Sequence, residues 1–284
     1  IRKKVIAMKN MLRLDLYRMI HGFAFKAALI LSALLGIWCL GLNVHEHYRS
    51  LEALQNQTIA YSYPYSVYNG CISADGVTLP STLLFALLPF LTTLPYGAAL
   101  AQDLRTGYIK NLAIKTSRQI IYASRYITVF IGAFLVVMFA TTGQMLFSMM
   151  FLPVLPPEIA SFSFPLMTVG HVGASFYAQH PLAYLILYNL FDAVFLAAFA
   201  SVSIFVAGLV RNAFFALIGP TVLFYALTYL FDFLGLTIYR PDFIITPYVG
   251  IALSSTVMCL EAIFILLLSV GLCAFSCVRN RDVF

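Results

Sequence analysis

The sequence is poor in charge and has no segment suited to a soluble domain. Asp, Glu, Lys and Arg make up 10% of its 284 residues, whereas hydrophobic residues make up 62% and the mean hydropathy is +0.91. Average soluble domains carry about 25% charged residues. This composition excludes an ordinary soluble protein and predicts that most of the chain is in a membrane.

Motifs for common active sites are also missing. No Gly-x-x-x-x-Gly-Lys-Ser/Thr phosphate-binding loop, His-Glu-x-x-His or Gly-x-Ser-x-Gly occurs. Four of the five cysteines are in apolar stretches and Cys71 has no obvious external partner, which argues against a disulfide framework. We therefore expect no enzyme, no catalytic residue, no metal ligand and no cofactor bound by this chain.

Six long apolar runs are present instead. They cover about 24–43, 81–101, 126–151, 182–209, 213–234 and 256–277. A membrane-spanning helix needs about 20 mostly apolar residues. The runs predict an all-α polytopic membrane protein with six transmembrane helices.

Basic residues are distributed unequally around these runs. Of the 17 Lys and Arg residues, only Arg49 and Arg240 fall on one side of the six-span topology. The positive-inside rule places the other side in the cytoplasm, together with both termini and the 102–125 segment. The net charge of +6 is thus attributed to topology and lipid headgroups, and no nucleic-acid partner is expected.

The segment 1–23 before the first run has helical periodicity. Its apolar residues recur every three or four positions. They are Val5, Met8, Leu12, Leu16, Met19 and Ile20. This pattern predicts an amphipathic helix in the cytoplasmic membrane interface. A plain basic anchor for the first span is the alternative.

The cytoplasmic connection at 102–118 is polar but patterned. Leu104, Tyr108 and Leu112 are spaced as on one helical face, and Gly107 interrupts the run. We expect a short helix that offers these apolar residues to a partner. The surrounding cations would orient that partner, and they are Arg105, Lys110, Lys115 and Arg118. The alternative is a solvated basic loop.

This connection resembles the coupling-helix region of ABC-2 type permeases. The resemblance rests on Asp103-x-x-x-Gly107-x-x-Lys110, then Leu112 and Ser117-Arg118. The usual order has Thr after the glycine and a Pro step before Ser-Arg. Here Thr106 precedes Gly107, and Ile114-Lys-Thr-Ser replaces the proline step.

Further features extend the resemblance over 1–284 as one transmembrane domain. They are the Gly208-Leu-Val-Arg-Asn212 connection, the following Gly219-Pro220, the N-terminal helix and the six spans. The resemblance implies a permease subunit that exports an amphipathic or hydrophobic substrate, such as a peptide, lipid-like molecule or drug.

The same resemblance implies the partners and the location. Two copies of an ABC ATP-binding subunit would bind ATP and Mg, and a second permease, identical or homologous, would complete the exporter. A bacterial plasma membrane is the expected site. An ion-coupled secondary transporter or a passive channel-like protein is the alternative.

Three acidic residues fall within or at the ends of the apolar runs. Their heights follow from the helix rise of about 1.5 Å per residue, counted from Arg211 and Arg279. On this count all three, Asp192, Asp232 and Glu261, lie roughly 27 to 31 Å above the cytoplasmic interface. With Arg240 they are candidates for an outer vestibule or gate. Solvated helix ends are the alternative.

Small residues in the runs suggest close helix contacts. Ala193, Ala197 and Ser201 follow one another at four-residue steps, and Ser32 and Gly36 do the same. Each stripe is interpreted as helix packing or as a dimer seam. Between the last two runs, Gly235 to Ser255 is apolar but broken by prolines, which predicts a re-entrant hairpin.

Overall fold

A computed structural model describes residues 2–56, 66–73, 75, 78–155, 172–246 and 253–279. Every regular element in these ranges is helical and none is a strand, which confirms the all-α prediction for this part of the chain.

The helices vary in length from three residues to 33. They are α1 (Arg2–His21), α2 (Phe23–Gln55), α3 (Val67–Gly70), α4 (Leu79–Leu91), α5 (Ala99–Arg105), α6 (Tyr108–Lys115), α7 (Arg118–Met138), the π-helix η1 (Phe139–Gly143), α8 (Gln144–Ser148), α9 (Ala174–Gln179), α10 (Pro181–Ser201), α11 (Ser203–Val210), α12 (Ala213–Phe233), the 3-10 helix η2 (Thr237–Tyr239), α13 (Pro241–Ile244) and α14 (Ser255–Arg279).

Five stretches are long and apolar enough to cross a membrane. They are Phe23–Ala53, Arg118–Ser148, Pro181–Val210, Ala213–Phe233 and Ser255–Arg279. These correspond to the first, third, fourth, fifth and sixth predicted runs. Each exceeds the roughly 20 residues that a bilayer requires.

The second predicted run, 81–101, is not one continuous helix. It is divided into α4 and α5 by turns at 92–98. Pro95 lacks the amide hydrogen that a helix needs. The Thr93 hydroxyl donates to the Leu217 carbonyl of α12 at 2.8 Å, which fastens the turn to the bundle. The 13-residue α4 covers only about 20 Å, less than the bilayer core.

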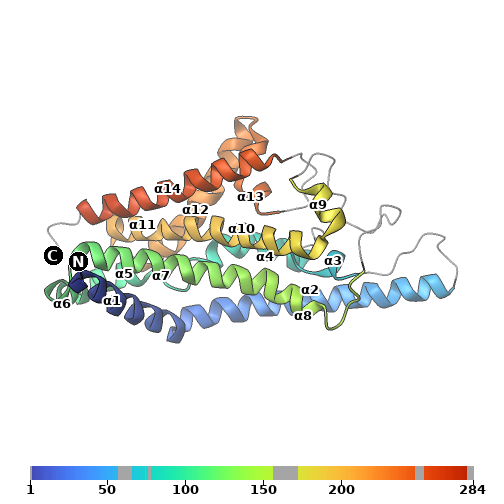
Figure 1. Cartoon of the computed structure of the whole chain (residues 1–284), viewed down its shortest axis with the longest axis horizontal. Coiled ribbons are helices and arrows are strands. Elements are labelled where there is room, and N and C mark those ends of the chain that lie inside the picture. Colours follow the sequence, from blue (N-terminus) through green and yellow to red (C-terminus); the bar gives the residue numbers. More distant parts are fainter. Residues whose placement is uncertain are drawn as a thin grey trace.

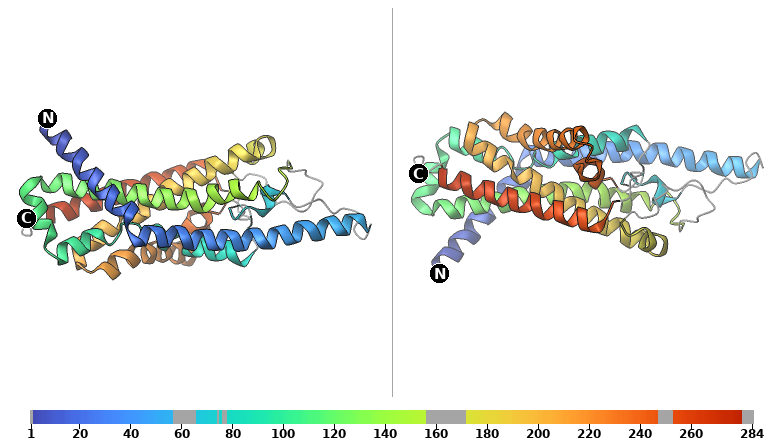
Figure 2. Two further views of the ribbon diagram at one scale, coloured as in Figure 1. Left: turned by 90° about the horizontal axis from the view of Figure 1, so that it is seen from below. Right: turned by 90° about the horizontal axis from the view of Figure 1, so that it is seen from above.

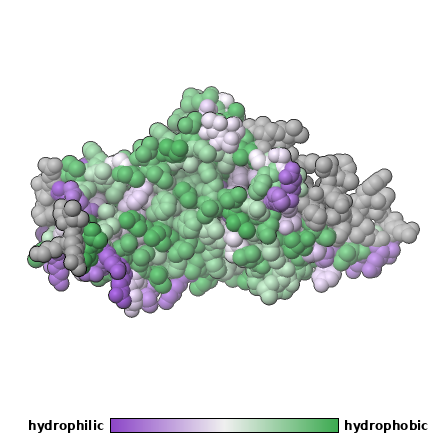
Figure 3. Space-filling model, in the orientation of Figure 1, coloured by the Kyte–Doolittle hydropathy of each residue, from purple (hydrophilic) through white to green (hydrophobic). Residues whose placement is uncertain are grey.

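The helices form an elongated bundle with distinct ends. The start of α1, the helices α5 and α6, and the end of α14 lie at one end, whereas α3 and α9 lie at the other (Figures 1 and 2). Hydrophobic side chains cover most of the flank in Figure 3, and hydrophilic ones gather toward the ends. Such an extensive exposed apolar surface suits a lipid environment.

The interior contains two apolar cores that α10 helps to join. One core includes Leu88, Phe195 and Phe199, and the other, at the α5–α6 end, includes Met19 and Ile109. In the most apolar 18-residue stretch of the span Pro181–Val210, 72% of the residues are buried inside the chain. Helix α10 packs against α7, α14, α12 and α4, so it is the central helix of the bundle.

Helix α1 confirms the predicted N-terminal helix, but its buried face overlaps the predicted stripe only in part. Met19 of the stripe is buried against the bundle together with Met11 and Asp15, whereas Val5 and Ile20 of the stripe are exposed. The buried face includes a charged residue because α7 supplies partners for it. Periodicity of apolar residues alone could not reveal that face.

The predicted re-entrant hairpin at 235–255 lies partly outside the described residues. Its described part consists of the short helices η2 and α13. Ile244 and Ile245 are buried, and the Tyr188 hydroxyl of α10 donates to the Ile244 carbonyl at 2.7 Å. This segment is therefore anchored to the central helix.

Candidate functional site

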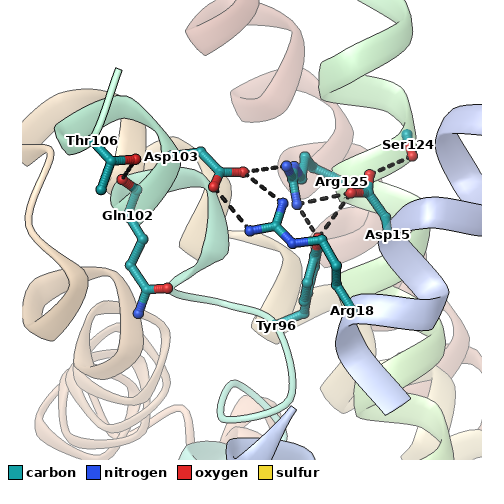
Figure 4. Close-up of polar contacts among 8 residues, drawn as sticks. All are labelled: Asp15, Arg18, Tyr96, Gln102, Asp103, Thr106, Ser124 and Arg125. Carbon is teal, nitrogen blue, oxygen red and sulfur yellow. Dashed lines mark hydrogen bonds and ion pairs between the residues drawn. The ribbon is translucent and has the colours of Figure 1, made fainter. Parts of the chain in front are cut away.

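Six polar side chains from separate parts of the chain meet at the α5–α6 end, and we call them the buried charge cluster. They are Asp15 and Arg18 of α1, Tyr96 of the turn before α5, Asp103 of α5, and Ser124 and Arg125 of α7. Figure 4 shows their polar groups converging. Asp15 is 0%, Arg125 1% and Asp103 3% exposed, so this is an ionic site inside the protein.

Arg125 is at the centre of the cluster. One of its amino groups, Nη1, lies 2.9 Å from Oδ1 of Asp15 and also donates to the Tyr96 hydroxyl. The other, Nη2, donates to Asp103. Arg125 therefore joins α7 to α1, to the turn and to α5 at once.

The two carboxylates of the cluster have different environments. Asp15 accepts from the Tyr96 hydroxyl at 2.8 Å and from the Ser124 hydroxyl at 2.6 Å. Asp103 accepts a bidentate pair from Arg18, with both distances 3.0 Å. Bidentate arginine pairs fix geometry as well as charge. Asp103 thus connects the 102–118 segment to α1.

Two carboxylates and two guanidinium groups make the cluster formally neutral. Buried charges are stable only when they are paired and hydrogen-bonded. The Asp103 carboxylate raises the pKa of Arg18 above its already high ordinary value, with smaller contributions from Tyr96 and Asp15. Arg18 is therefore a permanent cation here.

Helix α6 follows α5 after a sharp change of direction. Gly107 has φ 73°, a left-handed conformation that favours glycine, and it caps the first turn of α6. The Arg18 guanidinium lies 5.3 Å from the centre of the Tyr108 ring. The first residue of α6 therefore also contacts the cluster.

The two faces of α6 differ. Ile109 and Leu112 are buried in the core, while Lys110 and Lys115 are exposed. Ile114 is 86% exposed and is the large apolar side chain on the outer face. The helix offers solvent a cationic surface with one apolar side chain.

The predicted roles along 102–118 need one correction. Leu104 and Leu112 are 8% and 9% exposed, so they hold α5 and α6 on the core and cannot supply apolar contact to a partner. Tyr108 is half-buried against Arg18. The predicted cations remain accessible: Arg105 is exposed, as are the two lysines of α6, and Arg118 is half-buried.

An open groove of about 570 Å³ adjoins the cluster. Its lining consists of Arg18, Gln102, Asp103, Thr106, Tyr108 and Asn111. The Thr106 hydroxyl donates to the Gln102 carbonyl at 2.9 Å and closes the last turn of α5, as Figure 4 shows. The groove leaves this edge of the cluster accessible from outside.

The predicted outer residues do not form one site. Arg240 bonds Asp232 at 2.5 Å and Asp242 at 2.7 Å. Both carboxylates, Asp242 first, raise the pKa of Arg240. Within the part of the chain that the structure describes, no hydrogen bond or ion pair links Asp192 or Glu261 to this group.

Burial also separates these acids. Asp232 at the end of α12 is half exposed, as a solvated helix end would be. Asp192 is 1% exposed and lies in the middle of α10, so the solvated-end alternative is wrong for it. Counting residues along a helix gives depth in a membrane but not burial by neighbouring helices.

The predicted small-residue stripes are inside the chain. Ala193, Ala197 and Ser201 of α10 are almost fully buried, and so are Ser32 and Gly36 of α2. A Cβ on Gly36 would come within 2.8 Å of the Gln144 side chain. All five pack within one copy of the chain, so a seam between two copies would need other residues.

The sequence alone does not mark four members of the cluster as site residues: Asp15, Tyr96, Ser124 and Arg125. By position along the chain, Arg125 is only one of the topological charges. One signal was present, because Asp15 shares a helical face with Met11 and Met19. A carboxylate between apolar residues on one face needs a buried partner.

No protein-family model, curated protein or solved structure matches the chain. Its class therefore rests on its own structure. Five long apolar helices and an apolar flank make it a multi-pass membrane protein.

Arg18→Ala is expected to loosen α1 from α5 without unfolding the bundle. The Arg18 side chain is 35% exposed, so solvent screens its ion pair, and Asp103 keeps Arg125 as a partner. The free energy that holds α1 to α5 should therefore fall by only about 1 kcal/mol. Hydrogen exchange of α1 backbone amides should become about fivefold faster. Arg13→Ala, an exposed arginine of the same helix, is the control. Equal exchange in both variants would contradict the role of Arg18.

Proposed function

We propose that the protein is the permease subunit of an ATP-driven exporter and that α6 receives a separate ATP-binding subunit. The observation that carries this proposal is the way α6 is attached. It is short, it presents lysines outward, and it follows directly on α5, whose Asp103 is paired with Arg18 of α1 and Arg125 of α7. A plain solvated loop would need no such attachment.

The buried charge cluster provides a route for movement. A force on α6 would act through Gly107 on α5, whose Asp103 is paired with Arg18 of α1 and Arg125 of α7. Packed cores and ion pairs transmit displacement because they resist gradual deformation. In this mechanism, ATP binding in the partner moves α6, and α1 and α7 move with it.

The other parts of the exporter follow from what this chain has and lacks. Its sequence contains no phosphate-binding loop motif, so two ATP-binding subunits would supply ATP and Mg binding. A second permease, identical or homologous, would complete the path for an amphipathic or hydrophobic substrate. The proposed location is the plasma membrane of a bacterium, with both termini and α6 in the cytoplasm.

A second candidate is an ion-coupled transporter. The observation favouring it is the buried Asp192 carboxylate on the central helix. Ionisable groups inside membrane bundles commonly mark ion or proton pathways. The two candidates differ in whether an ATP-binding partner is needed.

Co-purification tests the exporter proposal directly. The detergent-solubilised protein is isolated from its native host after mild cross-linking, and bound proteins are identified by mass spectrometry and nucleotide binding. We expect an ATP-binding subunit with the wild type. Lys110→Glu/Lys115→Glu should reduce its capture at least tenfold, because two cationic contacts become repulsive, about 1.4 kcal/mol or more in total.

Lys9→Glu/Arg13→Glu is the matched control, because it makes the same change of charge at exposed positions of α1. It should retain the ATP-binding subunit. Equal loss in both double variants would show that α6 is not the docking surface. No ATP-binding protein with the wild type would overturn the proposal.

A further inference from the structure

Asp192 is a buried carboxyl group that the proposed coupling mechanism does not use. It lies near the middle of α10 and is 1% exposed. Its Oδ1 atom has no hydrogen-bond partner. A carboxylate held this way, without compensating charge, would be strongly unfavourable. The site therefore requires a ligand that removes the charge.

The helices around Asp192 do not supply that charge. Among the described residues, α4, α9, α12 and the π-helix η1 contain no Lys, Arg or His. On α14 the only cation is Arg279 at its last position, and on α7 Arg118 and Arg125 are in its first eight residues. Arg125 is already paired with Asp15 and Asp103.

Other titratable groups near Asp192 are neutral or acidic. Tyr184 and Tyr188 of α10 are close enough for Asp192 to act on them electrostatically. Apart from the arginines already named, the elements packed on α10 add weakly acidic groups and carboxylates but no base. These are Tyr122 and Tyr126 of α7, Tyr177 of α9, Tyr225, Tyr229 and Asp232 of α12, and Glu261 with Cys259, Cys273 and Cys277 of α14.

A distorted segment of the facing helix lies beside this position. The π-helix η1 continues α7, and its Thr142 hydroxyl accepts from the Asn189 amide at 3.2 Å. Asp192 follows Asn189 by three residues, so the two share a face of α10. π-helical turns are rare in proteins overall, and those that occur are often found at functional sites.

We propose that Asp192 is a proton-binding site at the contact between α10 and η1. The ligand is the proton itself, which neutralises the carboxylate without occupying additional space. Release of the proton places an unpaired negative charge on the central helix. That charge favours a rearrangement of the α10–η1 contact that admits water, and uptake of the proton reverses it.

A metal cation suits the site less well. Sodium or a divalent ion needs several oxygen ligands around it. Among the described residues, no group of three His, Cys, Asp or Glu side chains is placed to hold a metal. The Asn189 amide is directed at Thr142, and the Tyr188 hydroxyl at Ile244. The nearby polar side chains are thus engaged with other partners.

Thermal denaturation of the full-length protein in detergent, across a pH series, tests the proposal. Unfolding brings the carboxyl into water, where it gives up its proton above about pH 4. Stability of the wild type should therefore fall as pH rises, by up to tenfold in the unfolding equilibrium per pH unit. Asp192→Asn mimics the protonated form and should lose most of this dependence.

Glu261→Gln is the matched variant on α14, because Glu261 also has a buried oxygen without a partner. Because Glu261 is only half-buried, this variant should keep most of the pH dependence of the wild type. A dependence removed by Glu261→Gln and kept by Asp192→Asn would overturn the proposal and assign the proton to Glu261. Identical dependence in all three proteins would also overturn it.

Infrared spectroscopy tests the proposal on the wild type alone, so its result does not depend on whether a variant folds. Protein labelled with ¹³C-aspartate should show an isotope-shifted band of a protonated carboxyl at neutral pH. Absence of the band would contradict the proposal. Stabilisation by sodium over choline at constant pH, lost in Asp192→Asn, would show a metal cation instead and would also overturn it.

The proton site does not depend on the exporter proposal. Failure to capture an ATP-binding subunit would leave the infrared and pH results unaffected. Conversely, an ionised Asp192 would leave the docking of a partner on α6 unaffected.

Discussion

Arg125→Met is expected to lower the free energy of unfolding by about 3–5 kcal/mol. Methionine fills most of the arginine's volume but provides no charge. Asp15, with 0% exposure, would then be buried without a cation, and Asp103 would keep only Arg18. The Tyr96 hydroxyl would also lose the donor that faces it. The loss is large because the unpaired carboxylate remains inside the protein.

Denaturant titration in mixed micelles would measure this loss, with helical content as the signal. Arg105→Met is the control, because Arg105 is an exposed cation on α5 next to the same region. Substitutions at such surface positions usually change stability by about 0.5 kcal/mol or less. Similar losses in both variants would mean that the buried charge cluster contributes no more than a surface charge.

The architecture was largely predictable because membrane helices are encoded by composition. Five of the six apolar runs correspond to helices that can cross a bilayer, since lipid requires about 20 apolar residues in each. The exception is the second run, which is interrupted by two residues within it. Pro95 and the hydroxyl of Thr93 interrupt the second run, and an average over a window of residues does not detect them.

The candidate site was only partly predictable. Asp103 and Gly107 were identified because they belong to a pattern within one segment. Arg125 and Asp15 were not, since their roles depend on the contact between α7 and α1. The two residues are 110 positions apart in the sequence. Residues that neutralise one another across a bundle leave no local signature when each is read alone.

The apolar residues of 102–118 show a related limit. Leu104 and Leu112 lie on two helices, α5 and α6, and not on one helical face, and their spacing does not say whether they meet the chain's own core or another protein. Both side chains are buried in the core that includes Met19 and Ile109. The free face consists of lysines and Ile114, and a partner would have to recognise that surface.

Replacing the three deeply buried charges together is expected to restore at least half of the stability that Arg125→Met removes. The variant Asp15→Asn/Asp103→Asn/Arg125→Met removes the three deeply buried charges and leaves only Arg18, whose side chain is 35% exposed and can be hydrated. Replacement of complete buried ion networks by neutral groups is often neutral or even stabilising by about 1–4 kcal/mol. We therefore expect the triple variant to recover at least half of the loss in the same titration.

The triple variant also separates stability from attachment of α6. It keeps the packing of Ile109 and Leu112 but loses the ion pairs that tie α5 to α1 and α7. Hydrogen exchange in α5 and α6 should thus stay faster than in the wild type, even where global stability has recovered. A triple variant as unstable as Arg125→Met would show that Arg125 acts by packing. Recovery of stability together with wild-type exchange would show that the cores alone hold α6, and the proposed route of movement through the charges would be wrong.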